Sequence, residues 1–229
     1  MVTRRGFFPL AAGFGMVAAS GIASLPAQAA TGPQDTVNHA LGTLQDLRGD
    51  KEFGNARALF PRARAVLIAP RIFKAGFFVG GEGGRAVLMA RGKDGGWSEP
   101  AFYTIASASF GLQFGAQESE LIMFIMSNKA LHALMRNKFQ IGANAGIAVA
   151  TLGSTVAGAT TSNGGPDIIV WASSSGIYAG VSLDGTVIEP QPAVDKAYYG
   201  RPLTSHDIVI RQEGHNPGAA SLLASLNGL

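Results

Sequence analysis

Hydrophobic residues recur along this chain with two different periods. Within residues 35–47 they recur every three or four positions and would share one face of a helix, at Val37, Leu41, Leu44 and Leu47. Similar spacing predicts a short helix over residues 128–135, capped by Asn128, and a final helix over residues 219–226. The rest of the chain has too few such patterns for a helical bundle.

Shorter apolar runs predict β-strands. Residues 66–69 are too few for a helix, and Pro70, which cannot donate to a sheet ladder, is expected to end that strand. Residues 121–126 form a six-residue apolar run, which is typical of a strand buried on both faces. Further strands are predicted around residues 107–117, 139–150, 168–172 and 176–188, the last as a hairpin that turns at Asp184-Gly185.

A glycine cluster follows the first strand. It consists of the four glycines around Glu82, namely Gly80, Gly81, Gly83 and Gly84. Their spacing matches neither of the phosphate-binding patterns G-x-G-x-x-G and G-x-x-x-x-G-K-[ST], and no helix-forming segment follows them. Because apolar residues alternate on both sides, we predict that the cluster forms the turn of a hairpin, with positive φ angles or close backbone approach.

Composition supports one sheet-rich domain. The chain has 229 residues, of which 31 are glycine and only 14% are charged. No repeat or low-complexity linker divides it. We therefore expect a single α+β domain over residues 30–229, with a largely antiparallel sheet or barrel-like β core and a few short helices.

The first 29 residues have the features of an export signal. Arg4 and Arg5 precede an uncharged apolar stretch, residues 10–22, and the small-x-small sequence Ala27-Gln28-Ala29 follows. This pattern predicts a cleavable signal of the twin-arginine type, too short for a spanning helix. The chain has no cysteine, which excludes disulfides, cysteine metal sites and a lipoprotein anchor. We expect the remainder to be periplasmic or secreted and peripheral to a membrane.

Charge places one constraint on the partner. Arg4 and Arg5 are two of the 18 basic residues, so residues 30–229 carry 16 basic against 15 acidic side chains, and no nucleic-acid-binding face is expected. Cations and aromatic rings do interleave in one stretch, at Arg62, Arg64, Arg71, Phe73, Lys74, Phe77 and Phe78. Such a mixture suits an anionic, partly apolar surface such as phospholipid head groups, although a solvated turn with core aromatics has the same pattern.

Catalytic motifs are absent from the sequence. The histidines at 39, 132, 206 and 215 lie far apart, and there is no H-E-x-x-H or G-x-S-x-G motif. Glu82 and Asp184 each offer one carboxylate in a glycine-containing loop, a pattern more typical of turns than of a cation site. We therefore predict no catalytic residue, metal or cofactor, leaving open a site assembled from distant residues.

Several blocks of the sequence resemble the SYLF domain family, a lipid-binding module of eukaryotic endocytic and actin-patch proteins that also occurs in exported bacterial proteins. They include KAGFFVGGEGGRAVL within residues 65–91 and the segments 97–102, 109–117, 139–143, 176–185 and 198–200.

The resemblance implies a non-enzymatic domain that binds anionic phospholipids, which are phosphoinositides for the eukaryotic members. Those members carry a basic amphipathic helix ahead of the domain, whereas the helix predicted here offers only His39 and Arg48 as cations. The expected ligand is therefore another anionic or general phospholipid. The alternative is a periplasmic structural or protein-interaction module that binds an envelope protein and has no lipid affinity.

Overall fold

The computed structural model describes residues 32–76, 79–110, 117–136, 138–142, 146–152, 165–174 and 185–229. By its contacts the chain divides into residues 1–30 and a unit from Thr31 to Leu229, and the following description concerns the second. The predicted export signal, Phe77, Phe78 and the predicted turn at Asp184 lie outside the described residues.

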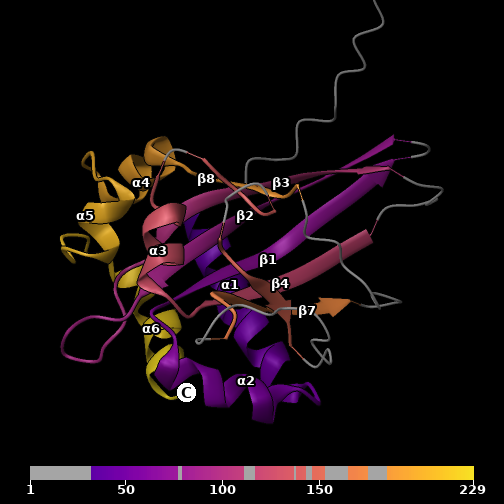
Figure 1. Cartoon of the computed structure of the whole chain (residues 1–229). Helices are drawn as coiled ribbons and strands as arrows, with labels where there is room; N and C mark the ends of the chain where they lie inside the picture. Colours follow the sequence, from indigo (N-terminus) through magenta and orange to yellow (C-terminus); the bar gives the residue numbers. More distant parts are fainter. Residues whose placement is uncertain are drawn as a thin grey trace, which may run out of the picture. The chain divides into compact units, whose positions relative to one another are not determined.

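The unit combines short helices with one sheet (Figure 1). In chain order its elements are α1 (Pro33–Gly49), α2 (Phe53–Leu59), the 3-10 helix η1 (Phe60–Arg62), β1 (Ala65–Gly76), β2 (Val79–Ala90), β3 (Ala101–Phe110), β4 (Gln117–Ile125), α3 (Asn128–Leu134), β5 (Phe139–Gln140), β6 (Val149–Thr151), β7 (Ile168–Ser174), β8 (Val187–Pro190), α4 (Pro192–Tyr199), α5 (Ser205–Val209), the 3-10 helix η2 (Pro217–Ala219) and α6 (Ala220–Asn227).

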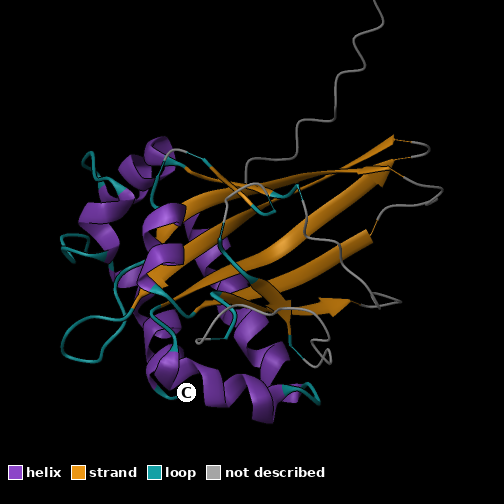
Figure 2. Cartoon of the chain, in the orientation of Figure 1, coloured by secondary structure: helices purple, strands orange, loops and turns teal. Residues whose placement is uncertain are grey.

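The described strands form one curled sheet in the order β5-β8-β3-β2-β1-β4-β7-β6 (Figure 2). Every neighbouring pair is antiparallel except β6 and β7, which are parallel. The predicted α+β domain with a largely antiparallel, barrel-like sheet is thus confirmed.

Alternating side chains of the central strands fill a separate core on each face of the sheet. One core contains Leu67, Leu88 and Met123 together with residues of α3 and α5, and we call this side the α3 face. The other contains Val66, Met89 and Phe124 with residues of α1, α2 and α6, and we call it the α1 face. Figure 1 shows α1 and α3 on opposite sides of the strands.

The predicted first helix is confirmed as α1. Pro33 occupies its first turn, where a missing N–H costs nothing, and the Asp35 carboxylate accepts a hydrogen bond from the Gly32 N–H at 2.9 Å. Its predicted apolar face lies on the sheet, with Val37, Leu44 and Leu47 buried. The helix α3 is also confirmed, but Ser127 rather than Asn128 caps it, since the Ser127 hydroxyl accepts from the Ala130 N–H.

Pro70 does not end the first strand, so that prediction is wrong. Instead β1 continues to Gly76 through a bulge. Ile68 pairs with Val87 and Arg71 pairs with Arg85, so β1 has one more residue than β2 between these two pairs. The bulge supplies the place where a residue without an N–H fits inside a sheet. It also exchanges the two faces: Ile68 belongs to the core on the α1 face, whereas Ile72 belongs to the core on the α3 face.

The glycine cluster is not a turn, which corrects the second prediction for this region. Gly80, Gly81, Gly83 and Gly84 all lie inside β2 and pair with both β1 and β3. The pairing of β1 with β2 extends to Gly76 and Gly80. Close backbone approach is nevertheless the reason for one of these glycines, because a Cβ atom on Gly84 would lie 2.1 Å from the Arg71 carbonyl oxygen at the bulge.

Other local predictions fared unevenly. Residues 139–150 form the two short strands β5 and β6 rather than one continuous strand, whereas the strand at residues 168–172 is confirmed as β7 and the final helix as α6. The helices α4 and α5 were not predicted, although each has a local signal. Pro192 begins α4 and Gly200 follows it in the left-handed conformation, while Thr204 and Asp207 form a capping box for α5.

Replacing Gly84 by alanine should lower the free energy of unfolding by about 1–3 kcal/mol, because the new methyl group meets backbone of β1 rather than a movable side chain. The matched control is Gly83→Ala, since a Cβ there would lie 3.6 Å from its nearest neighbour, the Ile105 carbonyl oxygen. Urea unfolding of the two variants and the wild type provides the comparison. Equal stability of both variants would contradict the close approach at the bulge.

Candidate functional site

The structure separates the residues that were predicted to contact lipid. Arg62 lies in η1 and Arg64 directly precedes β1, whereas Arg71 and Phe73 lie beyond the bulge. A strand rises about 3.3 Å per residue, so Arg64 and Phe73 are roughly 30 Å apart. The side chain of Lys74, and both Phe77 and Phe78, lie outside the described residues. The seven residues therefore do not form one continuous patch.

Two of the predicted residues, Arg71 and Phe73, lie near Glu118 toward the far end of β1. We call these three residues the hairpin-end patch. The bulge turns Arg71 and Phe73 toward the α1 face. Phe73 is 39% exposed, and the Arg71 Nε atom lies 2.8 Å from the Glu118 Oε1 atom in an ion pair open to solvent. In Figure 1 this end of β1 and β2 projects beyond the helices that cover the sheet.

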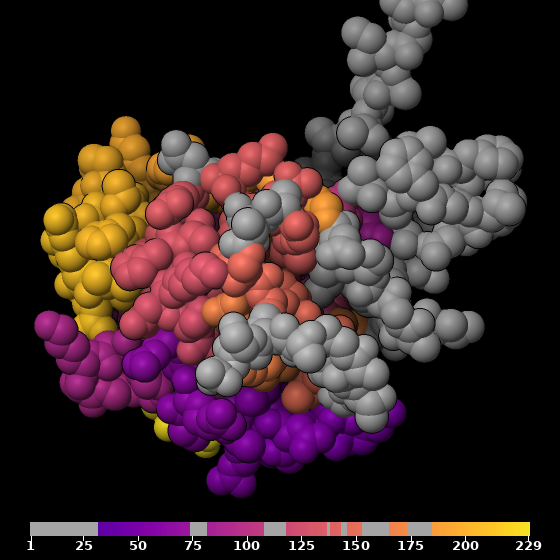
Figure 3. All heavy atoms as spheres, viewed as in Figure 1, coloured from indigo at the N-terminus to yellow at the C-terminus, as the bar shows by residue number. Residues whose placement is uncertain are grey.

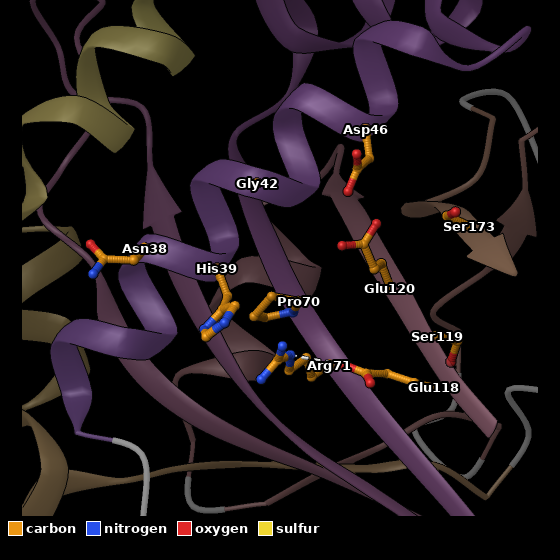
Figure 4. Close-up of a pocket in the computed structure, with 10 residues that line it drawn as sticks. All are labelled: Asn38, His39, Gly42, Asp46, Pro70, Arg71, Glu118, Ser119, Glu120 and Ser173. Atoms are coloured by element: carbon orange, nitrogen blue, oxygen red, sulfur yellow. Dashed lines mark ion pairs between the residues drawn. The ribbon is translucent and has the colours of Figure 1, made fainter. Parts of the chain in front are cut away.

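A hollow of about 440 Å³ lies beside this patch, between α1 and the sheet (Figure 4). Its lining comes from α1, the β1 bulge, β4 and β7, and comprises Asn38, His39, Gly42, Asp46, Pro70, Arg71, Glu118, Ser119, Glu120 and Ser173. The bulge helps to form the hollow, because its residues Pro70 and Arg71 line the side opposite α1. Both charge signs occur in the lining, so the hollow is not a simple anion or cation site.

Two carboxyl groups face each other across this hollow, Asp46 from α1 and Glu120 from β4 (Figure 4). The pKa of Glu120 is raised to about 7, chiefly by burial and also by the neighbouring Asp46 and Glu118 carboxylates, against the Thr43 hydroxyl, which donates to Glu120 Oε1 at 3.0 Å. Glu120 therefore keeps its proton to a higher pH than an exposed glutamate does, and while it is protonated it does not repel the Asp46 carboxylate.

A further acidic group is completely buried where α4 packs on β3. Asp195 of α4 accepts a hydrogen bond from the Phe102 N–H at 2.9 Å through Oδ1, and its Oδ2 atom has no partner among the described residues. Burial raises the pKa of Asp195 to about 7. Tyr103 and Ser205 lie nearby, and the pKa of the Tyr103 hydroxyl is also raised by burial. A protonated Asp195 thus holds α4 against β3 without a buried charge.

Sequence reasoning missed both acidic groups. For Glu120 a signal existed, since Glu118-Ser119-Glu120 leads directly into an apolar strand, which places Glu120 on the face of Ile122. Asp195 had no signal, because an aspartate in a short amphipathic helix is usually exposed. Neither group forms a metal site, as no cluster of three or more histidine, aspartate or glutamate residues suitable for a metal occurs in the described ranges.

Membrane insertion by a spanning helix has no support in the described part of the chain, where no helix has the length and apolar character that crossing a bilayer requires.

The two acidic groups predict an unusual pH dependence of stability. Their ordinary pKa values are 4.5 for Glu120 and 3.8 for Asp195, and both are raised to about 7 in the folded chain. Between these limits the folded state binds more protons than the unfolded state. The contribution of these groups to the free energy of unfolding is therefore fully present at about pH 4 and is lost as the pH rises to 7. The loss is at most about 1.4 kcal/mol per pH unit for each group, and it is smaller for the partly solvated Glu120.

Urea unfolding of the wild type and of Glu120→Gln and Asp195→Asn, measured from about pH 4.5 to pH 8, checks this expectation. Each variant should show a flatter decline than the wild type, since a neutral amide cannot ionise. Curves parallel to that of the wild type would mean that these carboxyl groups do not retain their protons.

Comparison with known proteins places the chain in a family. Residues 106–229, just over half of the chain, match the family model Ysc84, described as Las17-binding protein actin regulator. Protein YSC84 of Saccharomyces cerevisiae is 31% identical over 168 residues, which cover 72% of this chain and 36% of that protein. The SH3 domain-containing YSC84-like protein 1 of Rattus norvegicus is 27% identical over 157 residues, 68% of this chain and 46% of the relative. The human protein of that name is 29% identical over 139 residues, 60% and 41% of the two chains.

The chain thus spans less than half the length of these relatives. The match nevertheless covers the described domain from β3 to α6, and the resemblance drawn from the sequence blocks agrees with it. The chain belongs to the Ysc84 family of SYLF domains.

Proposed function

We propose that this chain is an exported, non-enzymatic SYLF domain that binds anionic phospholipid through the hairpin-end patch. The observation that carries the proposal is Phe73, a large apolar side chain that is 39% exposed beside the solvent-open guanidinium group of Arg71. An apolar ring next to a cation is the combination that an interface of acyl chains and phosphate groups accommodates.

The ion pair between Arg71 and Glu118 sets how strongly this patch can bind. Both side chains are about half exposed, so the pair contributes little to folding and an anionic head group can replace the carboxylate. A basic residue near an anionic membrane contributes about 1 kcal/mol, and a phenylalanine ring that becomes fully buried contributes about 1.5–3 kcal/mol. Lys74, Phe77 and Phe78 follow directly in the sequence and belong to the same proposal.

A protein partner is the second candidate. The family description names Las17 binding and actin regulation, and a Saccharomyces cerevisiae relative is called LAS seventeen-binding protein 3, so proteins of this family are named for a polypeptide partner. For the present chain the corresponding proposal is an interaction module for an envelope protein, without lipid affinity.

Co-sedimentation with vesicles decides between these candidates. The wild type should bind vesicles rich in phosphatidylglycerol and not those of phosphatidylcholine. The double variant Arg71→Glu with Lys74→Glu should bind more than about tenfold more weakly at low salt, because two attractive charges become repulsive. Phe73→Ala should lose the part of the binding that persists at high salt. Glu118→Gln should bind more tightly than the wild type, since it frees Arg71 from its ion pair.

The control for charge is Arg136→Glu, an exposed arginine that follows α3 on the opposite face of the sheet. It should leave vesicle binding unchanged. If the wild type does not distinguish the two vesicle types even at low salt, the lipid proposal fails and the protein-interaction module takes its place.

Export is the remaining part of the proposal and rests on residues 1–29. Changing Arg4 and Arg5 together to lysine should abolish export in a bacterium with a twin-arginine system, because that pathway reads the arginine pair rather than its charge. Immunoblots of periplasmic and cytoplasmic fractions measure it, with Arg48→Lys as the matched control outside the signal. Normal export of the double variant would exclude this type of signal.

A further inference from the structure

Four cations gather at the opposite end of β1 from the hairpin-end patch, and we call them the base cluster: Arg62, Arg64, Arg91 and Lys93. Because Ala65 pairs with Ala90, Arg64 and Arg91 stand directly opposite each other, and the Arg91 N–H donates to the Arg64 carbonyl at 2.8 Å. Cβ atoms of such cross-strand pairs lie about 4.5–5.5 Å apart, and like charges there are destabilising. An opposed arginine pair therefore needs an explanation.

Among the described residues, the Arg91 side chain contacts neutral groups. It donates to the carbonyl of Phe60 at 2.8 Å and to that of Gly95 at 2.6 Å, and its guanidinium carbon lies 4.3 Å from the ring centroid of Trp97. Its Nε atom is buried and has no hydrogen-bond partner among the described residues. Figure 3 shows the segment after β2 adjoining the early part of the domain at the lower left. The protein thus fixes this cation rigidly without neutralising it.

The other members of the base cluster are exposed and carry no ion pair to a residue that the structure describes: Arg62, Arg64 and Lys93. The acidic neighbour in the chain, Asp94, is engaged locally, since its carboxylate accepts from the Gly96 N–H at 3.2 Å. The cluster accordingly presents an excess of positive charge on one small surface.

The chemistry of the cluster differs from that of the hairpin-end patch. Within the described ranges the exposed large hydrophobic residues are Phe73 and Ile210, and neither belongs to the base cluster. The cluster therefore has no side chain to insert among acyl chains. Guanidinium groups bind carboxylates through paired hydrogen bonds, and a polypeptide segment with several acidic side chains offers several carboxylates to a surface that carries several cations.

We propose that the base cluster is a docking surface for an extended acidic segment of a partner polypeptide, whose carboxylates pair with Arg64 and Arg91. This surface is distinct from the proposed lipid site, from which it is separated by roughly the length of β1, about 30 Å. The chain can then hold a membrane at one end of its sheet and an acidic polypeptide at the other.

Fluorescence anisotropy with a labelled oligo-glutamate peptide tests the proposal on the folded chain. Arg64→Glu should weaken binding by about tenfold at low salt, and the difference should shrink as salt is added. The matched variants are Arg136→Glu on the opposite face and Arg71→Glu at the hairpin end, and both should bind the peptide like the wild type. Arg64→Glu should also retain its affinity for phosphatidylglycerol vesicles, so failure of this proposal and failure of the lipid proposal are distinguishable.

Three results would overturn the docking surface. In the first, the wild type does not bind oligo-glutamate at low salt. In the second, Arg64→Glu binds the peptide as tightly as the wild type. In the third, Arg136→Glu weakens binding as much as Arg64→Glu does, which means that binding depends only on the net charge of the protein. Loss of vesicle binding in Arg64→Glu with unchanged peptide affinity would also overturn it and would make the base cluster a membrane surface.

Discussion

The bulge in β1 determines which side chains of the central strand face which layer of helices. Val66 and Ile68 pack under α1, whereas Ile72, beyond the bulge, packs toward α3. The extra residue that causes this exchange is accommodated where Pro70 has no N–H to pair. The same bulge brings the Arg71 carbonyl so close to β2 that only glycine fits at position 84. Pro70, Arg71 and Gly84 thus depend on one another and form one structural unit, the bulge unit.

The surface chemistry on the α1 face follows from that unit. Because the faces exchange at the bulge, Arg71 lines the hollow beside α1 and pairs with Glu118, whereas Phe73, two residues further along β1, is exposed. Closer to the helix, the Glu120 and Asp46 carboxyl groups lie near each other, and burial together with the Asp46 charge raises the pKa of Glu120. The free energy of unfolding is therefore expected to be higher at mildly acidic than at alkaline pH. The raised pKa of Asp195 on α4 contributes to the same dependence.

The long central strands also keep two charged surfaces apart. The hairpin end combines an exposed ring with a paired arginine, while the base end carries cations without carboxylate partners among the described residues. The middle of the sheet is buried on both faces, and the two charged surfaces lie toward its ends. This geometry suits the proposed binding of one anionic partner at each end of the sheet.

The sequence by itself determined the fold class, the helix α1, the buried strand β4 and the final helix, since hydrophobic periodicity is a local property that packing only reinforces. It also located the aromatic and basic residues near β1. It could not place them, because a strand interruption at Pro70 and a bulge at Pro70 have the same local sequence, and only pairing with β2 and β4 distinguishes them. Likewise, the glycine cluster has the local sequence of a turn. Only the position of the Arg71 backbone in the folded chain explains why a glycine is needed at position 84. The tertiary structure alone decided that Arg64 meets Arg91, that Glu120 meets Asp46 and that Asp195 is buried, since each depends on contacts between residues distant in the chain.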